Sequence, residues 1–160
     1  MIEVSEALLI GVATYADKAA LESNAENVKA ALGEAASMMA GPPDRSIGTM
    51  VATAFPTPKV AVTSGCAGAV TGIAVQPGKW EQAEEEFASQ IPSFETWPGI
   101  VSLSMVKVTE EQIMIVALYS SEEAMASNAE RVKGALGSLA AIFAAPPDRS
   151  TGVVRLAFPE

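Results

Sequence analysis

Two asparagines stand where the sequence pattern calls for an apolar residue, and they are the first candidates for chemistry. Asn24 precedes Val28, and Asn128 precedes Val132, by four residues, the spacing of one face of a helix. A buried carboxamide must find hydrogen-bond partners or cost roughly 1–3 kcal/mol. Each side chain could therefore line a pocket and orient a carbonyl or another oxygen atom. Alternatively, each could hydrogen-bond a neighbouring strand or loop and serve folding alone.

Aromatic side chains form a second group of candidates. Trp80, Phe94 and Trp97 lie along one predicted helix and its exit loop, and the indole N–H needs a partner, which suits the edge of a pocket. They could wall an aromatic or polyketide-like ligand, and we include Met105, on the following predicted strand, among the pocket residues. The alternative is that they pack the helix end against the sheet or form a dimer contact.

Polar residues at the ends of predicted strands complete the candidate set. Tyr119 closes one strand, and its hydroxyl could donate to an enolate or simply cap a sheet edge. Arg149 follows a double proline and Asp148, so a local ion pair, or an arginine reaching back to Glu130, is the ordinary explanation. An arginine facing a ligand carboxylate is the alternative.

Composition excludes several classes of function. The chain has no histidine, which removes the commonest general base and the commonest transition-metal ligand; we expect no metal site and no cofactor. A formal net charge of −9 disfavours nucleic acid and anionic membranes as partners. A single cysteine, Cys66, and an N-terminus without a basic leader favour a cytoplasmic protein.

The elements that position these residues are partly duplicated. From position 7 to position 48, 21 of 42 residues recur identically 104 residues later without a gap. The clearest matches are Ser-Asn-Ala-Glu, starting at 23 and 127, and Pro-Pro-Asp-Arg-Ser, starting at 42 and 146. Such self-similarity indicates a repeated structural unit.

The first copy predicts strand, helix, strand. Apolar runs favour strands at 7–15 and 46–55, and the helix between them begins near Asp17, a plausible N-cap, and stops at the double proline. A short strand at 59–63 and a glycine-rich turn then form a junction.

The second copy belongs to a longer series of elements. The pattern predicts a helix that ends before Pro92 and another that opens with a capping box from Ser120 to Glu123. The four strands are predicted at 69–76, 100–108, 112–119 and 150–158. This order is the ferredoxin-like βαββαβ unit. We therefore predict an α+β fold with a half repeat at 1–57, a junction at 58–68 and a complete ferredoxin-like domain at 69–160. A half unit exposes sheet edges, so it must be completed by the 59–63 segment or by another chain, and we expect a homodimer.

The whole pattern resembles the dimeric α+β barrel superfamily, and within it the antibiotic-biosynthesis-monooxygenase-like domains. The resemblance is carried by Gly72-Ile73-Ala74-Val75, the helix at 80–91, Pro98-Gly99 and the hairpin into Ile115-Val116-Ala117-Leu118-Tyr119. It continues through Ser120-Ser121-Glu122-Glu123-Ala124 and Pro146-Pro147. It implies antiparallel sheets that form a barrel, with a pocket between sheet and helices. That pocket hosts cofactor-free oxygenation, haem breakdown, isomerisation or no known chemistry, and the missing histidine counts against haem breakdown.

The resemblance implies a cofactor-independent monooxygenase-like or isomerase-like reaction on a small apolar, enolisable compound. Trp80 and Trp97 would then exclude water, while Asn128 and Tyr119 would donate hydrogen bonds to developing oxyanion charge. The alternative is a non-catalytic ligand-binding or stress-associated barrel whose asparagines are structural.

Overall fold

The computed structural model describes residues 1–157. These residues form two compact units: Met1–Gly11 together with the chain from Ile47 onward, and Val12–Ser46. The strands of the half repeat belong to the larger unit, so the compact units do not follow the boundaries of the sequence repeat.

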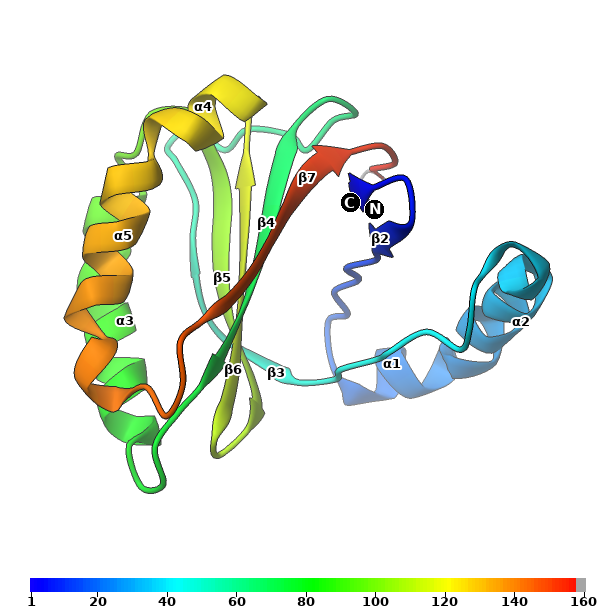
Figure 1. Ribbon diagram of the computed structural model, residues 1–160, viewed down its shortest axis with the longest axis horizontal. Coiled ribbons are helices and arrows are strands. Elements are labelled where there is room, and N and C mark those ends of the chain that lie inside the picture. The colour runs from blue at the N-terminus through cyan, green and yellow to red at the C-terminus, as the bar shows by residue number, and fades with distance from the viewer. Residues whose placement is uncertain (158–160) are drawn as a thin grey trace. The chain divides into compact units, whose positions relative to one another are not determined.

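The larger unit is built on one seven-stranded antiparallel sheet, with strand order β2-β1-β7-β4-β6-β5-β3 (Figure 1). The strands are β1 Ile2–Ser5, β2 Leu8–Ile10, β3 Thr49–Ala54, β4 Ala67–Ala74, β5 Ile100–Thr109, β6 Gln112–Tyr119 and β7 Asp148–Val154. The helices are α3 Trp80–Phe94, α4 Glu122–Ser127, α5 Ala129–Ser138 and a short 3-10 turn, η2, at Ala140–Ile142. The four central strands with α3, α4 and α5 make the predicted βαββαβ unit.

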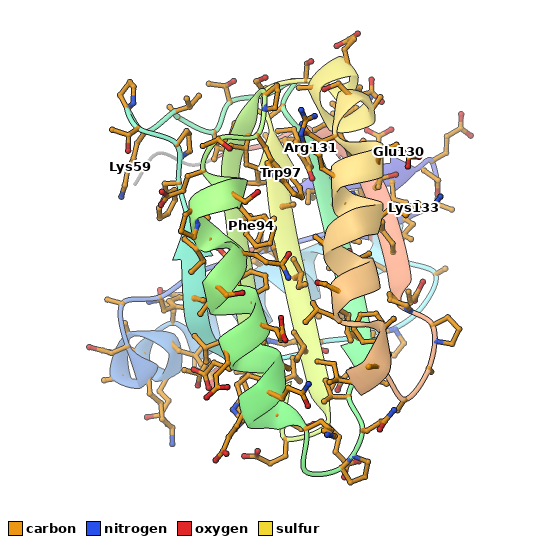
Figure 2. The ribbon with its side chains drawn as sticks, turned by 90° about the vertical axis from the view of Figure 1, so that its left-hand side faces the viewer. Lys59, Phe94, Trp97, Glu130, Arg131 and Lys133 are labelled. Atoms are coloured by element: carbon orange, nitrogen blue, oxygen red, sulfur yellow. The ribbon has the colours of Figure 1, made fainter. Side chains whose placement is uncertain are left out.

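Both long helices, α3 and α5, cover the same face of the sheet and lie side by side across it (Figures 1 and 2). Because side chains alternate along a strand, every second residue of β6 faces these helices, and Ile113, Ala117 and Tyr119 belong to the main core. The opposite face carries a smaller apolar cluster that includes Val70 and Val116.

The half-repeat strands lie at the two outer edges of this sheet. β3 pairs with β5, and β2 pairs with β1, which in turn pairs with β7. The predicted strand at 7–15 is therefore wrong beyond Ile10: its counterpart β6 is hydrogen-bonded on both sides, whereas β2 has β1 alone as a neighbour. β1 itself was not predicted, because the short Ile-Glu-Val-Ser segment has no flanking turn signal of its own.

Other predicted elements differ as well: the strands predicted at 46–55 and 69–76 are observed at Thr49–Ala54 and Ala67–Ala74. No strand forms at 59–63 within the described residues. α3 continues through Pro92 to Phe94, since a proline in the last turn forfeits a single backbone hydrogen bond. The N-cap of α4 is Ser121 rather than Ser120, and its hydroxyl accepts a hydrogen bond from the Ala124 amide at 3.2 Å.

The last strand of the larger unit is shorter than predicted. The predicted strand at 150–158 corresponds to β7, which ends at Val154, and Phe158 lies outside the described residues. Among the helices that the structure describes, none has the length and apolar character needed to cross a membrane. The cytoplasmic location stays a prediction from sequence.

The smaller unit contains α1 Lys18–Ser23, α2 Ala25–Ala35 and the 3-10 turn η1 Ala36–Met38. Asp17 caps α1 as predicted, because its carboxylate accepts a hydrogen bond from the Ala20 amide at 2.8 Å. None of the described helical residues of this unit is buried. Its counterpart on α4 and α5 instead contributes residues to the main core of the larger unit.

Candidate functional site

A small cavity of about 30 Å³ lies between the sheet and the helices α3 and α5. Its lining combines an aromatic wall, aliphatic side chains and a few polar groups. The lining residues include Phe87, Phe94, Trp97, Leu136, Thr71, Tyr119 and Arg149. In this chamber, the polar side chains of Thr71, Tyr119 and Arg149 on the sheet face the helices.

The aromatic wall comes from α3 and the loop that follows it. The rings of Phe87 and Phe94 lie 5.3 Å apart between centroids, and Phe94 meets the Trp97 ring edge-on at 5.0 Å. Figure 2 shows Phe94 and Trp97 next to each other at the end of this helix. Such tilted and edge-to-face pairs are favoured by about 0.5–1.5 kcal/mol beyond their burial, so the wall is a rigid surface.

Polar groups enter the chamber from the sheet. Thr71 on β4 and Arg149 on β7 are direct cross-strand partners, which places both side chains on one face. The Arg149 guanidinium donates a hydrogen bond to Thr71 Oγ1 at 3.2 Å. Thr71 is buried and Arg149 is half-buried.

Tyr119 lies at the end of β6 with its side chain fully buried. Its hydroxyl oxygen has no hydrogen-bond partner in the described part of the chain. Burial raises the pKa of Tyr119, and the positive charge of Arg149 offsets part of that rise. Arg149 is near enough to act on Tyr119 in this way, but the geometry of a hydrogen bond is met only toward Thr71.

Arg149 is the site residue that sequence reasoning placed wrongly. The expected pair with Asp148 or Glu130 does not form: no ion pair among the described residues includes Arg149. The reason is that β7 begins at Asp148, and consecutive residues on a strand point to opposite faces. The strand was predicted to begin at Ser150, which left Arg149 in the preceding turn instead of on the strand, where it pairs with Thr71.

Asn128 is fully buried but does not line the chamber. Its side-chain amide donates to the Pro98 and Ala124 carbonyls, both at 2.8 Å. It sits at the junction of α4 and α5 and ties that junction to the loop that carries Trp97. The two donor hydrogens are thus used by the backbone.

The other three predicted pocket residues lie away from the chamber. Trp80 begins α3, at the opposite end from Trp97. The Lys107 ammonium lies over its ring, 4.3 Å from the ring centroid. Met105 is buried in the core under β5. Asn24 belongs to the smaller unit and donates to the Ala20 carbonyl at 3.0 Å. The structure therefore brings together Phe94, Trp97 and Tyr119 of the predicted set.

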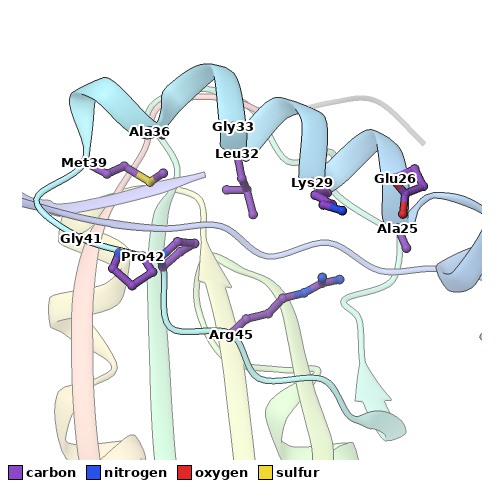
Figure 3. Close-up of a pocket in the computed structure, with 11 residues that line it drawn as sticks. Ala25, Glu26, Lys29, Leu32, Gly33, Ala36, Met39, Gly41, Pro42 and Arg45 are labelled. Carbon is purple, nitrogen blue, oxygen red and sulfur yellow. The ribbon is translucent and has the colours of Figure 1, made fainter.

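The smaller unit has a hollow of its own under α2, an open groove of about 630 Å³ (Figure 3). Leu32 and Arg45 line this groove, and they are the repeat counterparts of Leu136 and Arg149, which line the chamber. The same two positions therefore face an open groove in one copy and an enclosed cavity in the other.

Comparison with known proteins supports the fold alone. No family model matches the chain, and no curated protein matches it. A proposed monooxygenase from Fusobacterium nucleatum matches with a TM-score of 0.68 at 12% identity, covering 88% of this chain and 67% of its own. A second one, from Lactobacillus acidophilus, matches with a TM-score of 0.62 at 11% identity, covering 88% and 71%.

A variant of SnoaB, a cofactor-independent oxygenase from Streptomyces nogalater, matches with a TM-score of 0.52 at 17% identity, covering 61% of this chain and 100% of its own. The chain has the fold of the antibiotic-biosynthesis-monooxygenase-like α+β barrels. The matched share of this chain is 61% for SnoaB, which is close to the length of one βαββαβ unit, and 88% for the two longer neighbours, which exceeds that length.

Proposed function

We propose that the protein binds a small enolisable ring compound in the chamber and acts on it as a cofactor-independent monooxygenase-like or isomerase-like enzyme. The observation that carries this proposal is the Tyr119 hydroxyl, which is fully buried, lacks a partner and belongs to a chamber with an aromatic wall. A buried polar group without a partner is rare, and a ligand oxygen would satisfy it.

Tyr119 would act as a hydrogen-bond donor. Because burial raises its pKa, the phenol keeps its proton at neutral pH and can donate to the oxygen of a forming enolate. No carboxylate or histidine lines the chamber within the described residues, so the substrate must be one that enolises readily. In the monooxygenase version, a methylene group and dioxygen give a carbonyl group and water, with the substrate supplying the electrons and dioxygen accepting them.

Asn128 would contribute as a positioning residue. Its bond to the Pro98 carbonyl fixes the loop that presents Trp97 to the chamber. A direct hydrogen bond from Asn128 to the substrate, as predicted from the sequence, would require its amide to leave two 2.8 Å contacts. We therefore propose that it supports the wall rather than the reacting atoms.

A non-catalytic ligand-binding or stress-associated barrel is the second candidate. The version without a ligand is supported by the chamber volume of about 30 Å³, which is close to the volume of one water molecule in the liquid and far below a typical ligand pocket of about 300–1,000 Å³. Any organic ligand must therefore widen the chamber, by shifting α3 against α5.

Oxygen uptake separates the two candidates. The protein would be screened by thermal shift against small ring ketones such as 2-tetralone and anthrone, and each compound that binds would be followed with an oxygen electrode and ¹⁸O₂ labelling. We expect labelled product and a Tyr119→Phe rate lower by about 100-fold with binding retained. Tyr15→Phe, at the repeat counterpart of Tyr119, is the matched control. Binding with neither oxygen uptake nor isomerised product would favour the non-catalytic barrel.

We also propose that the protein is a homodimer in which a second copy covers the groove under α2. In the complete unit, the counterpart of this groove is enclosed by residues of β4, β6 and α3, and the half repeat has no counterpart of β4 or α3. Two half repeats together supply the two βαβ halves of one ferredoxin-like unit. Light scattering during size exclusion should give twice the mass of one chain, and Leu32→Asp should shift it to one chain. A monomeric wild-type protein would contradict this proposal.

A further inference from the structure

We infer that the ligand of the chamber is an anion, a ring compound whose negatively charged oxygen is received by Arg149. This inference rests on the proposed ligand chamber and narrows its ligand class. It concerns the guanidinium that enters the chamber from β7, at the position directly across from Thr71.

The first observation is the unmatched charge of Arg149. A guanidinium carries five N–H donors and a fixed positive charge. Among residues 1–157, the geometry of a hydrogen bond is met only toward the Thr71 hydroxyl, and the other polar group beside the guanidinium, the Tyr119 hydroxyl, is uncharged at neutral pH. No carboxylate of the described chain forms an ion pair with it. A cation withdrawn from water without a partner is costly, and an anionic oxygen would compensate it.

The second observation concerns the neighbouring Tyr119 and points to the same ligand. The Tyr119 hydroxyl is fully buried, lacks a partner and shares the chamber lining with Arg149. A phenol donor and a guanidinium placed together form a receptor for a negative oxygen, because both donate and neither supplies a negative charge at neutral pH. The aromatic wall of Phe94 and Trp97 would hold the ring of the same ligand.

The proposed anion receptor is a positively charged site in a chain whose net charge is negative. The formal net charge is −9, so the average field of the protein repels anions. Affinity for an anion must then come from particular groups rather than from the surface, and removal of one guanidinium should abolish it.

Binding of a matched pair of probes tests the inference. Benzoate and benzamide share a ring and a shape but differ in charge at pH 7, and their affinities would be measured by calorimetry on the full chain. Charge-assisted hydrogen bonds are worth about 1.5–3 kcal/mol, so we expect benzoate to bind about 10- to 100-fold more tightly than benzamide. Arg149→Met should remove that preference and change benzamide affinity less than about twofold.

The controls separate charge recognition from folding. Arg45→Met alters the repeat counterpart of Arg149 and should leave the preference intact. Arg149→Lys keeps the charge and should retain part of the preference, which provides a folded variant if Arg149→Met unfolds. 4-Nitrophenolate tests whether an ionised phenol serves as well as a carboxylate; tighter binding of either anion than of its neutral analogue supports the inference.

Failure of this inference differs from failure of the proposed function. Equal binding of each anion and its neutral analogue, or equal loss of benzoate and benzamide binding in Arg149→Met, would overturn the anion receptor while leaving a ligand chamber in place. Binding or turnover of neutral ketones without any binding of benzoate or 4-nitrophenolate would do the same. If no probe binds and no ketone reacts, both the receptor and the proposed function are wrong.

Discussion

Asn24 and Asn128 occupy the same position in the two copies of the repeat, yet Asn128 is fully buried and Asn24 is partly exposed. Both amides donate to the carbonyl four residues earlier, at Ala20 and Ala124. Asn128 makes one bond more, to the Pro98 carbonyl of a distant loop. The local role is thus kept in both copies, and the tertiary role exists in one.

The same contrast holds for the residues that face the sheet. Arg149 reaches Thr71, whereas the strand that contains Thr71, β4, has no counterpart in the half repeat. Where a neighbouring strand is present for both copies, the copies agree. Gly48 and Gly152 each face the backbone of an adjacent strand, at Lys107 and Glu3, too closely for a side chain. The duplicated residues therefore form one side of a packing interface. Their contribution to the free energy of unfolding depends on whether a neighbouring strand or helix forms the other side.

Alanine at the paired asparagines gives the largest expected difference. Asn128→Ala leaves the Pro98 carbonyl without its donor in a buried site and should lower the free energy of unfolding by about 3 kcal/mol. Asn24→Ala should cost less than about 1 kcal/mol, because its bond is local and partly exposed. Urea unfolding followed by far-UV circular dichroism measures both. Equal losses would show that the first copy is buried as deeply as the second.

Alanine at the paired leucines gives an intermediate difference. Leu136 packs against the main core, so Leu136→Ala should cost about 2 kcal/mol, whereas Leu32→Ala should cost under about 1 kcal/mol if nothing covers the groove. The measurement is again urea unfolding, now at two protein concentrations. A large cost for Leu32→Ala that grows with concentration would support the proposed dimer.

Tyr119→Phe gives the smallest difference, with the opposite sign. Removing a buried hydroxyl that has no partner should raise the free energy of unfolding by about 1 kcal/mol at pH 7. The raised pKa of Tyr119 means that the folded state binds its proton more tightly than the unfolded state. Its contribution is present below about pH 10, the ordinary tyrosine value, and falls as pH rises toward the folded pKa. That alkaline loss should be absent in Tyr119→Phe; a lower stability of the variant at pH 7 would show that the hydroxyl has a partner.

Periodicity predicted the central unit well because its elements are long and packed on one side. The strand predicted at 112–119 is observed at those residues, since it alternates between the core under the helices and the opposite face. The order of the βαββαβ unit and the α+β class follow from the same pattern. The buried setting of Asn128 could also be anticipated, because an amide in an apolar helix stripe must find partners.

The parts that failed depend on neighbours that a single sequence does not specify. Residues 11–15 repeat the pattern of a strand but have no strand beside them, so no ladder of hydrogen bonds forms. The ion pair preferred for Arg149 failed for a related reason, since the direction of its side chain depends on its pairing with Thr71 on β4. Trp80 and Trp97 seemed to belong together, but a helix of 15 residues separates them by about 20 Å or more.

The outer strands β2 and β3 have a consequence for the covalent path of the chain. They lie at opposite edges of a seven-stranded sheet, about 29 Å apart across six strand spacings, and residues 11–48 run from one edge to the other. A single proteolytic cut in that bridge would leave the β1–β2 hairpin held by noncovalent contacts alone. These include two residue pairs with β7, the backbone hydrogen bond from Arg155 to Met1, the 2.6 Å contact of Arg155 with Glu3 and the burial of Ile2. The protein would then be a complex of two fragments. Whether the N-terminal hairpin stays bound would depend on the concentration of the fragments, because the covalent link between them is gone.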